Sequence, residues 1–146
     1  LTMENKDWLI GRKLFKLARA ITNRNNAYLK ELGITGAQAE SLIFIADNQN
    51  RTINDLKDYL GISHQAAQGI AKRMMDSNLI VIQKFEKDRR QKILTPTPKG
   101  LDIRGQLRGN ALTTGERLLS EVSAEEKEVF FNVLTKALEV IQKDKS

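Results

Sequence analysis

A short charged run in the second half of the chain has side chains suited to binding a polyanion. Four basic residues surround one acidic residue there, between two apolar segments. Arginine favours a narrow DNA minor groove, where the negative potential is deepest, and a carboxylate can fix an arginine's direction by a charge-assisted hydrogen bond. The acid would then brace an arginine, and the lysines would flank phosphates. The five candidates are Lys87, Asp88, Arg89, Arg90 and Lys92.

Such a run is usually a solvated loop, so the distribution of charge along the whole chain has to distinguish a loop from a polyanion-binding segment. The net charge is +6, and residues 63–104 carry nine Lys/Arg against four Asp/Glu. Residues 1–62 carry nine against seven, and residues 105–146 carry six against seven. A positive zone confined to one part of a chain is the electrostatic signature of a polyanion binder.

A predicted helix over residues 64–77 precedes the charged run. Ala67, Ile70 and Met74 form its apolar back, which leaves polar and small side chains on the front. Glutamine can pair with adenine, alanine can pack on a thymine methyl group, and Gly69 lets the backbone approach a duplex. An ordinary surface helix would show the same two-sided pattern. The candidates are Ser63, His64, Gln65, Ala66, Gln68, Gly69, Lys72 and Arg73, the last two placed for phosphate.

Periodicity and capping signals predict the elements that position these residues. We expect helices over residues 6–32, 36–48, 53–60, 64–77, 98–120 and 124–143, and strands over residues 79–85 and 91–95. Gly33 and Asn78 are predicted to end helices in the left-handed conformation. The gap between the strands exceeds a tight turn and predicts a protruding loop. Two short helices joined by a tight turn and followed by a charged hairpin are typical of a winged helix-turn-helix.

The remaining helices supply core and interface candidates. On the fifth helix we expect Leu101, Leu107, Leu112 and Leu119 to face a core. The apolar stripes of the first and last helices are wider than one small lobe can cover. They either dock a partner chain or pack on each other. The candidate dimer residues are Ile10, Leu14, Leu17, Ile21, Phe130, Leu134, Ala137 and Ile141.

Composition argues against several other classes. Without cysteine the chain has no disulfide, no thiol nucleophile and no cysteine zinc site, and its single histidine is His64. Glu125, Glu126 and Glu128 cluster early in a helix, where acids favour the helix dipole. We therefore expect no enzyme activity, no cofactor and no metal. The polar, acidic start is unlike a signal peptide and no apolar window could span a membrane, so we expect a cytoplasmic protein.

The stretch "DRRQKILTPTPKG", residues 88–100, resembles the wing signature of the MarR family of bacterial transcriptional regulators. That signature runs Asp, any residue, Arg, an apolar strand, then Thr, Pro, Lys and Gly. The matching positions are Asp88, Arg90, Leu94, Thr97, Pro98, Lys99 and Gly100. Upstream, "LKDYLGISHQAAQGIAKRMMDSNLI" is similar to the family's helix-turn-helix. The sequence departs from the pattern at Pro96, usually an apolar residue, and at Asn78, usually glycine.

The resemblance implies a mainly α-helical, intertwined homodimer with a small β-hairpin wing. Its six helices would divide into a dimerisation lobe of residues 1–34 and 98–146 and a DNA-binding lobe of residues 35–97. It implies binding of a palindromic operator in double-stranded DNA, usually as a repressor, in the bacterial cytoplasm and at the nucleoid when bound. Many such proteins release DNA when a small aromatic or phenolic ligand enters a cleft. Candidate cleft residues, equally placed for the surface or the dimer, are Trp8, Arg12, Lys13 and Arg19.

Two other readings of the basic zone stay open at the level of sequence. A sequence-neutral architectural DNA-binding protein would use the same residues without reading bases. A protein-interaction winged helix would use the hairpin against an acidic partner. Binding to a palindromic site and to random duplex over a range of salt separates these readings.

Overall fold

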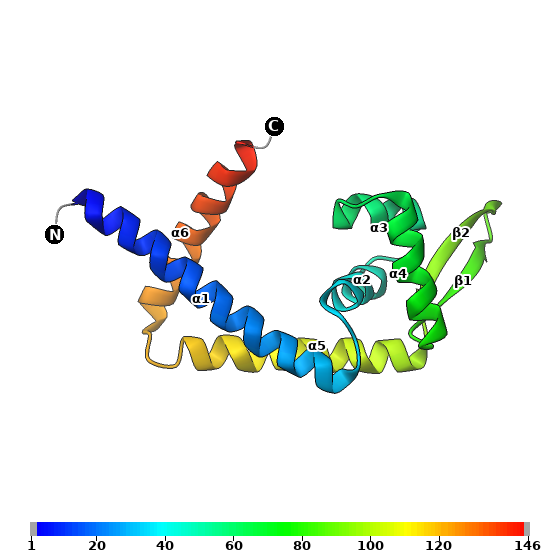
Figure 1. Ribbon diagram of the computed structural model, residues 1–146, viewed down its shortest axis with the longest axis horizontal. Coiled ribbons are helices and arrows are strands. Elements are labelled where there is room, and N and C mark those ends of the chain that lie inside the picture. Colours follow the sequence, from blue (N-terminus) through cyan, green and yellow to red (C-terminus); the bar gives the residue numbers. More distant parts are fainter. Residues whose placement is uncertain (1–2, 145–146) are drawn as a thin grey trace. The chain divides into compact units, whose positions relative to one another are not determined.

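The computed structural model describes residues 3–144, which form six helices and one two-stranded antiparallel hairpin (Figure 1). The mainly α-helical fold with a β-hairpin is therefore confirmed. None of the helices described there combines the length and apolar character that crossing a membrane requires. In chain order the elements are α1 (Met3–Leu32), α2 (Gly36–Asp47), α3 (Ile53–Leu60), α4 (His64–Asp76), β1 (Ile80–Phe85), β2 (Asp88–Pro96), α5 (Pro98–Leu118) and α6 (Ala124–Lys143).

The chain divides into two compact units, and the division falls inside α5. The first unit ends at Arg108 and contains α1 to α4, the hairpin and the first half of α5. The second unit begins at Gly109 and contains the rest of α5 and α6. The functional lobes expected from the sequence have other boundaries and stay a prediction.

Helices begin and end where local hydrogen bonding favours it. Gly33 and Asn78 both adopt positive φ, 74° and 59°, as predicted for residues that end helices. At the start of α6, Ser123 Oγ accepts from the Glu126 N–H at 3.1 Å, and Glu126 Oε1 accepts from the Ser123 N–H at 3.1 Å. This reciprocal pair satisfies two amides that the helix leaves free.

The hairpin is anchored by more than its own two strands. β1 and β2 pair from Ile80, opposite Pro96, to Phe85, opposite Asp88. A third segment joins them, because the Leu94 N–H donates to the Arg51 carbonyl at 2.7 Å. The sequence did not predict this bridge, which ties the residues before α3 to β2.

The apolar core of the described chain lies between Leu29 and Leu107, within the first unit. Helix α2 contributes Leu42, α3 contributes Leu56 and α4 contributes Met74, and none of these three side chains has measurable exposure. The back of α4 is thus part of the same core as α2 and α3. Burial on that side fixes which face of α4 meets solvent.

Two of the four core residues predicted on the fifth helix are wrong, and one of the four, Leu119, lies in the turn just after α5. Leu101 is 52% exposed and Leu112 is 58% exposed, while Leu107 is buried and Leu119 is half-buried. The spacings from Leu101 to Leu107 and from Leu107 to Leu112 are six and five residues, which do not follow the helical period. Ile103 and Leu107 are four residues apart, so they share a face, and both are buried.

Candidate nucleic-acid interface

Helix α4 has one face in the core and one face in solvent. Ala67, Ala71 and Met74 have no measurable exposure and Ile70 is 8% exposed. The predicted contact residues lie on the other side, where Gly69 is half-buried and the rest are exposed: Ser63, His64, Gln65, Ala66, Gln68, Lys72 and Arg73. Because the buried face cannot turn outward without opening the core, the exposed set is held in one orientation.

The N-terminal end of α4 is fixed by short-range contacts. Gly61, at φ 66°, ends α3 and turns the chain. Ser63 Oγ then accepts from the Ala66 N–H at 3.1 Å, which caps α4 as predicted. His64 Nδ1 lies 2.9 Å from Asn54 Oδ1 of α3, so the imidazole is held by a partner that the sequence did not suggest.

The exposed face of α4 has two unlike flanks. Helical spacing puts His64 and Gln68 on one flank and Ala66 and Arg73 on the other. The Arg73 guanidinium bends back along the helix, and its Nη1 would lie 3.7 Å from a Cβ added at Gly69. The sequence placed Arg73 for phosphate, further along the helix. The structure instead directs its charged end toward the middle of the exposed face.

The predicted bracing contact in the hairpin is present. Asp88 Oδ1 accepts from the Arg90 backbone N–H at 3.1 Å and from Arg90 Nε at 3.2 Å. The Arg90 side chain is 93% exposed, whereas that of Asp88 is 35% exposed. The carboxylate therefore fixes the base of the Arg90 side chain and leaves its far end in solvent. Lys87, Arg89 and Lys92 are also exposed.

The expected protruding loop is wrong. β2 begins at Asp88 rather than at residue 91, and only Glu86 and Lys87 connect the strands. The register shifts between the Lys84–Lys92 pair and the Phe85–Asp88 pair. Residues 89–92 of β2 are all exposed, so no apolar alternation reveals this part of the strand. Arg89 and Arg90 lie on β2 beside the turn, within this irregular part of the pairing, instead of in a free loop.

The second half of the wing signature locks the C-terminal end of α4 to the start of α5. Thr97 Oγ1 donates to the Asn78 carbonyl at 2.6 Å and accepts from the Gly100 N–H at 3.0 Å. Lys99 Nζ donates to the Ser77 carbonyl at 3.0 Å, where a cation also favours the negative end of the α4 dipole. These residues position α4 and do not extend the basic surface of the wing.

Gly100 completes this junction by its lack of a side chain. A Cβ added there would overlap the Leu79 carbonyl oxygen and would lie 3.3 Å from a methyl group of Leu42. The glycine of the signature is therefore required for close packing between α5 and the segment that follows α4.

An ion pair joins α5 to α2 within the first unit. Arg104 Nε and Nη2 donate to the two carboxylate oxygens of Asp47 at 3.0 Å and 2.7 Å. The hydrogen bond from Arg104 lowers the pKa of Asp47, against the opposing effect of desolvation. Asp47 ends α2, where a negative charge opposes the helix dipole, and Arg104 compensates for it. Charge alone did not reveal this pair, because the partners are far apart in sequence.

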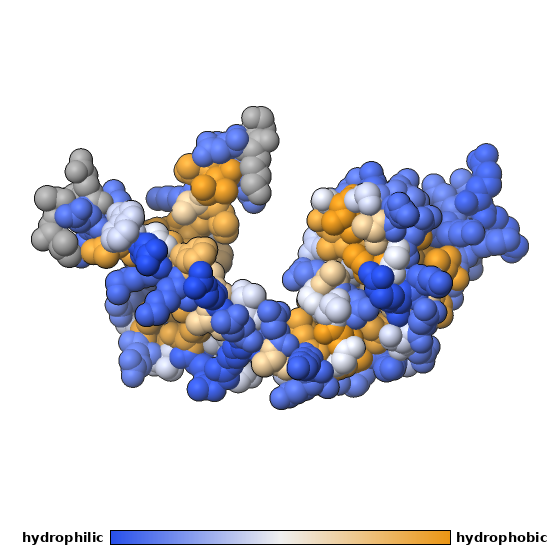
Figure 2. All heavy atoms as spheres, viewed as in Figure 1, coloured by the Kyte–Doolittle hydropathy of each residue, from blue (hydrophilic) through white to orange (hydrophobic). Residues whose placement is uncertain are grey.

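The candidate dimer residues divide by exposure. Ile10, Leu14 and Leu17 on α1 and Ala137 and Ile141 on α6 are exposed. Ile21, Phe130 and Leu134 are half-buried. No residue of α6 is buried, and Figure 2 shows apolar side chains on the surface of this helix. Other large apolar side chains exposed on α6 are Val129, Phe131, Val133, Leu138 and Val140.

The candidate ligand residues all lie exposed on α1. Arg12 stacks over Trp8 with 5.6 Å between the guanidinium carbon and the ring centre. Arg19 stacks in the same way over Phe15 at 4.9 Å, which brings in an aromatic residue that the sequence did not single out. Pairs of this kind are typical of residues four apart on a helix. Lys13 shows no such stacking contact.

Comparison with known proteins agrees with this geometry. A model of the MarR family matches residues 32–91, which contain α2, α3, α4 and the start of the hairpin. The HTH-type transcriptional regulator YybA of Bacillus subtilis is 27% identical over 135 residues, 92% of this chain and 90% of that protein. The HTH-type transcriptional regulator SAV2265 of Staphylococcus aureus is 31% identical over 94 residues. That match spans 64% of this chain and 60% of the relative's length.

A solved structure of a putative MarR family transcriptional regulator from Listeria monocytogenes, complexed with 26mer DNA, has a TM-score of 0.74. It is 26% identical in sequence, and the match covers 91% of this chain and 89% of that chain. The agreement extends across the helices and the hairpin as well as the segment that the family model matches. Residues 32–91 thus match the MarR family model, and the chain as a whole is similar to HTH-type transcriptional regulators and to a MarR-family structure solved with DNA.

Proposed function

We propose that the chain acts as a homodimeric repressor that binds a palindromic operator and releases it when a small ligand binds. Residues 1–34 and 98–146 would form the dimerisation lobe and residues 35–97 the DNA-binding lobe. The observation that carries the proposal is the exposed face of α4, held by a buried back, next to a hairpin with a braced arginine.

The DNA-binding part of the proposal assigns different grooves to α4 and the hairpin. The major groove admits an α-helix, and amide and small side chains at the helix front read base edges. Gln65, Ala66 and Gln68 are exposed on that front. Arg90, directed by Asp88, would enter the minor groove, and Lys87, Arg89 and Lys92 would contact phosphates.

The proposed two-fold symmetry is supported by the exposed apolar residues of the terminal helices. A dimer formed through them would present two copies of α4 about one DNA turn apart. Support comes from the exposure of Ile10, Leu14 and Ile141 in the single chain. Burial of these side chains against a second copy would remove apolar surface from water.

Ligand release is proposed through the aromatic and basic residues of α1. Trp8 is the single tryptophan of the chain, so its fluorescence reports directly on a ligand bound beside it. Titration with an aromatic carboxylate such as benzoate should quench that emission and lower operator affinity together, with Lys13→Ala and Arg19→Ala weakening both effects. Quenching without a change in operator affinity would remove this part of the proposal.

The operator is found by selecting bound duplexes from random DNA. Affinity for the selected operator and for random duplex is then measured over a series of salt concentrations. A sequence-specific regulator should prefer its operator by at least ~10³-fold. A sequence-neutral architectural protein would bind both duplexes alike, and a protein-interaction module would bind neither, and either result would contradict the proposal.

Substitutions assign the roles of individual residues. Arg90→Ala should weaken binding and reduce the slope of log affinity against log salt. Gln68→Ala should relax preference at one base pair, at about 1–3 kcal/mol. Lys136→Ala, which removes an exposed charge on α6, is the matched control and should change neither quantity. If Arg90→Ala binds the operator as tightly as the wild-type protein, Arg90 does not contact DNA.

A further inference from the structure

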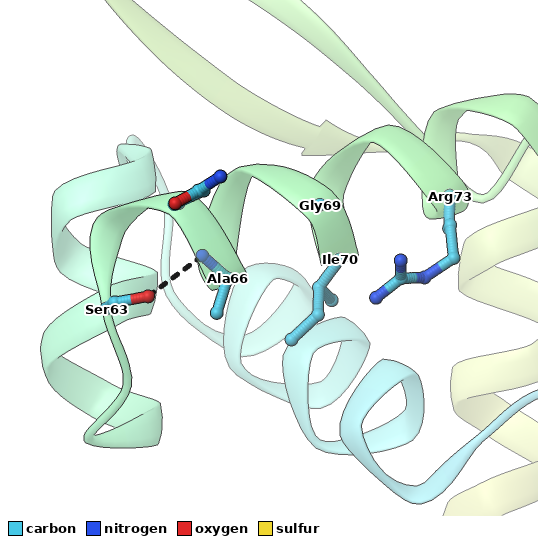
Figure 3. Close-up of a pocket in the computed structure, with 6 residues that line it drawn as sticks. Ser63, Ala66, Gly69, Ile70 and Arg73 are labelled. Atoms are coloured by element: carbon cyan, nitrogen blue, oxygen red, sulfur yellow. Dashed lines mark hydrogen bonds between the residues drawn. The ribbon is translucent and has the colours of Figure 1, made fainter.

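One flank of α4, the helix that carries the predicted base contacts, contains a hollow. It has a volume of about 390 Å³, is open to solvent and is lined by Ser63, Gln65, Ala66, Gly69, Ile70 and Arg73 (Figure 3). All six residues belong to α4 or to its N-cap, so the hollow runs along a single helix. The hollow is therefore part of the α4 surface that we propose enters the major groove.

The floor of the hollow is apolar and shallow. Ala66 contributes a methyl group, Gly69 contributes only backbone, and Ile70 lies beneath with 8% of its surface exposed. Gly69 keeps the hollow open, since any larger residue there would raise the floor. A small apolar group fits such a site better than a polar or bulky one.

The rim of the hollow carries a positive charge with free donors. Helical side chains lean toward the N-terminus, so Arg73 lies over the residue four positions before it. Its Nη1 and Nη2 atoms would be 3.7 Å and 3.9 Å from a Cβ at Gly69, and Figure 3 shows the guanidinium beside the hollow. Among residues 3–144, no acceptor is found within hydrogen-bonding distance of this guanidinium. Its donors are available to a ligand.

An apolar cup directly beside a two-pronged donor matches a specific feature of DNA. In the major groove, thymine presents a C5 methyl group, and guanine presents two acceptors, O6 and N7, that arginine binds in a bidentate manner. Because the cup and the guanidinium are neighbours on one helix flank, their targets must be neighbouring bases. Phosphate would satisfy the charge of Arg73 but would leave the cup unused.

We propose that this hollow reads a thymine next to a guanine: the thymine methyl group enters the cup formed by Ala66, Gly69 and Ile70, and Arg73 binds the guanine edge. The proposal rests on the proposed function and adds the sequence that α4 prefers. It also reassigns Arg73 from a phosphate contact to a specificity-determining residue. Lys72 keeps the phosphate role.

The test changes single atoms of the selected operator. Deoxyuridine in place of thymidine removes only the methyl group and should weaken wild-type binding about fourfold per site, as expected for exposing one buried methyl group. 7-Deazaguanine removes only the N7 acceptor, and its penalty should be roughly tenfold. Affinity is measured by fluorescence anisotropy for each duplex.

Protein variants connect those losses to the hollow. Arg73→Ala should bind the native and 7-deazaguanine duplexes equally, and Gly69→Leu, which fills the cup, should bind the thymidine and deoxyuridine duplexes equally. Lys72→Ala should keep both penalties, because it removes a charge without touching the cup. Circular dichroism and thermal unfolding verify that each variant is folded.

The outcomes separate this proposal from the proposed function. A half-site without adjacent thymine and guanine, or a 7-deazaguanine penalty that persists in Arg73→Ala, overturns the reading by the hollow while leaving a sequence-specific regulator. Failure to select any operator overturns the proposed function and this inference with it. The inference is supported if the deoxyuridine penalty disappears in Gly69→Leu and the 7-deazaguanine penalty disappears in Arg73→Ala.

Discussion

The first unit of the chain buries large apolar side chains, whereas α6, the last helix of the chain, exposes most of its own. In the unit that ends at Arg108, helices α2, α3 and α4 bury Leu42, Leu56 and Met74 completely. Helix α6 buries no residue, although Phe131 and Ile141 are among its large apolar side chains. Both regions carry large apolar side chains, but among residues 3–144 the buried apolar residues all lie in the first unit.

This difference indicates how the two regions of the chain obtain their stability. A closed core holds the exposed face of α4 in place whatever the protein concentration. An open apolar helix depends on a surface from elsewhere, which in the proposed dimer is a second copy. Substitutions in the first region should change the free energy of unfolding itself, and substitutions in the second should change association.

The largest effect is expected in the closed core. Leu42→Ala should lower the free energy of unfolding by about 2–5 kcal/mol, because it removes a fully buried side chain and leaves a cavity. Leu101→Ala on α5 is the matched control and should cost much less, since Leu101 is 52% exposed. Urea denaturation measures both. Equal losses would mean that the core of the first unit is not closed in the way described.

A second contrast uses two glycines of α5. Gly100→Ala should destabilise the protein by about 1–3 kcal/mol, because a Cβ there overlaps the Leu79 carbonyl. Gly105→Ala, one and a half turns later, should stabilise it by up to about 1 kcal/mol, since nothing lies within 4 Å of its added Cβ. Thermal unfolding of the pair at equal protein concentration decides. A stabilising Gly100→Ala would contradict the tight junction between α4 and α5.

The open region is tested through association. Ile141→Asp should raise the dimer dissociation constant by at least roughly tenfold, a change of about 1.4 kcal/mol, because a charge replaces an apolar side chain proposed to be buried between copies. Sedimentation equilibrium measures the constant directly. Lys136→Ala on the same helix serves as the control. A wild-type chain that remains monomeric at high concentration would show that α6 is not covered by a second copy.

The smallest effect is expected at the exposed edge of the closed unit. Asp47→Asn breaks the bidentate contact with Arg104 and should cost less than about 1 kcal/mol at neutral pH, because Asp47 is 46% exposed. The folded-state pKa of Asp47 lies below its ordinary value of 3.8, so the contribution of the ion pair is present above that value. It disappears as the pH falls through the folded-state pKa.

Denaturation of the wild-type protein and Asp47→Asn at several pH values tests this sign. The gap between the two curves should narrow below pH 3.8 and stay constant above it. A gap that widens on acidification would show that the ion pair does not stabilise the first unit.

Much of the fold and part of the interface could be predicted from the sequence. The cap of Ser63, the left-handed Asn78 and the apolar back of α4 all depend on neighbours within a few residues, so residue type and spacing reveal them. The contact between Asp88 and Arg90 was predictable for the same reason. The position of the Arg73 guanidinium over Gly69 also has a local cause, because helical side chains lean toward the N-terminus.

Other features had no local signal. The early start of β2 depends on pairing with β1, and charged residues at the tip of a hairpin look the same in a loop. Leu101 was misassigned because an apolar residue on α5 can face either way until its neighbours are known. The contact of His64 with Asn54 joins residues whose types are compatible with many partners.

The sequence by itself determined the helices, their caps, the location of the positive charge and the family resemblance, because hydrogen bonds at helix ends and side-chain periodicity act over a few residues. Only the tertiary structure decided that Lys99 meets the end of α4, that Gly100 must lack a side chain and that Arg104 reaches Asp47. The pair of Arg104 and Asp47 joins residues 57 positions apart, and chain folding alone brings them together.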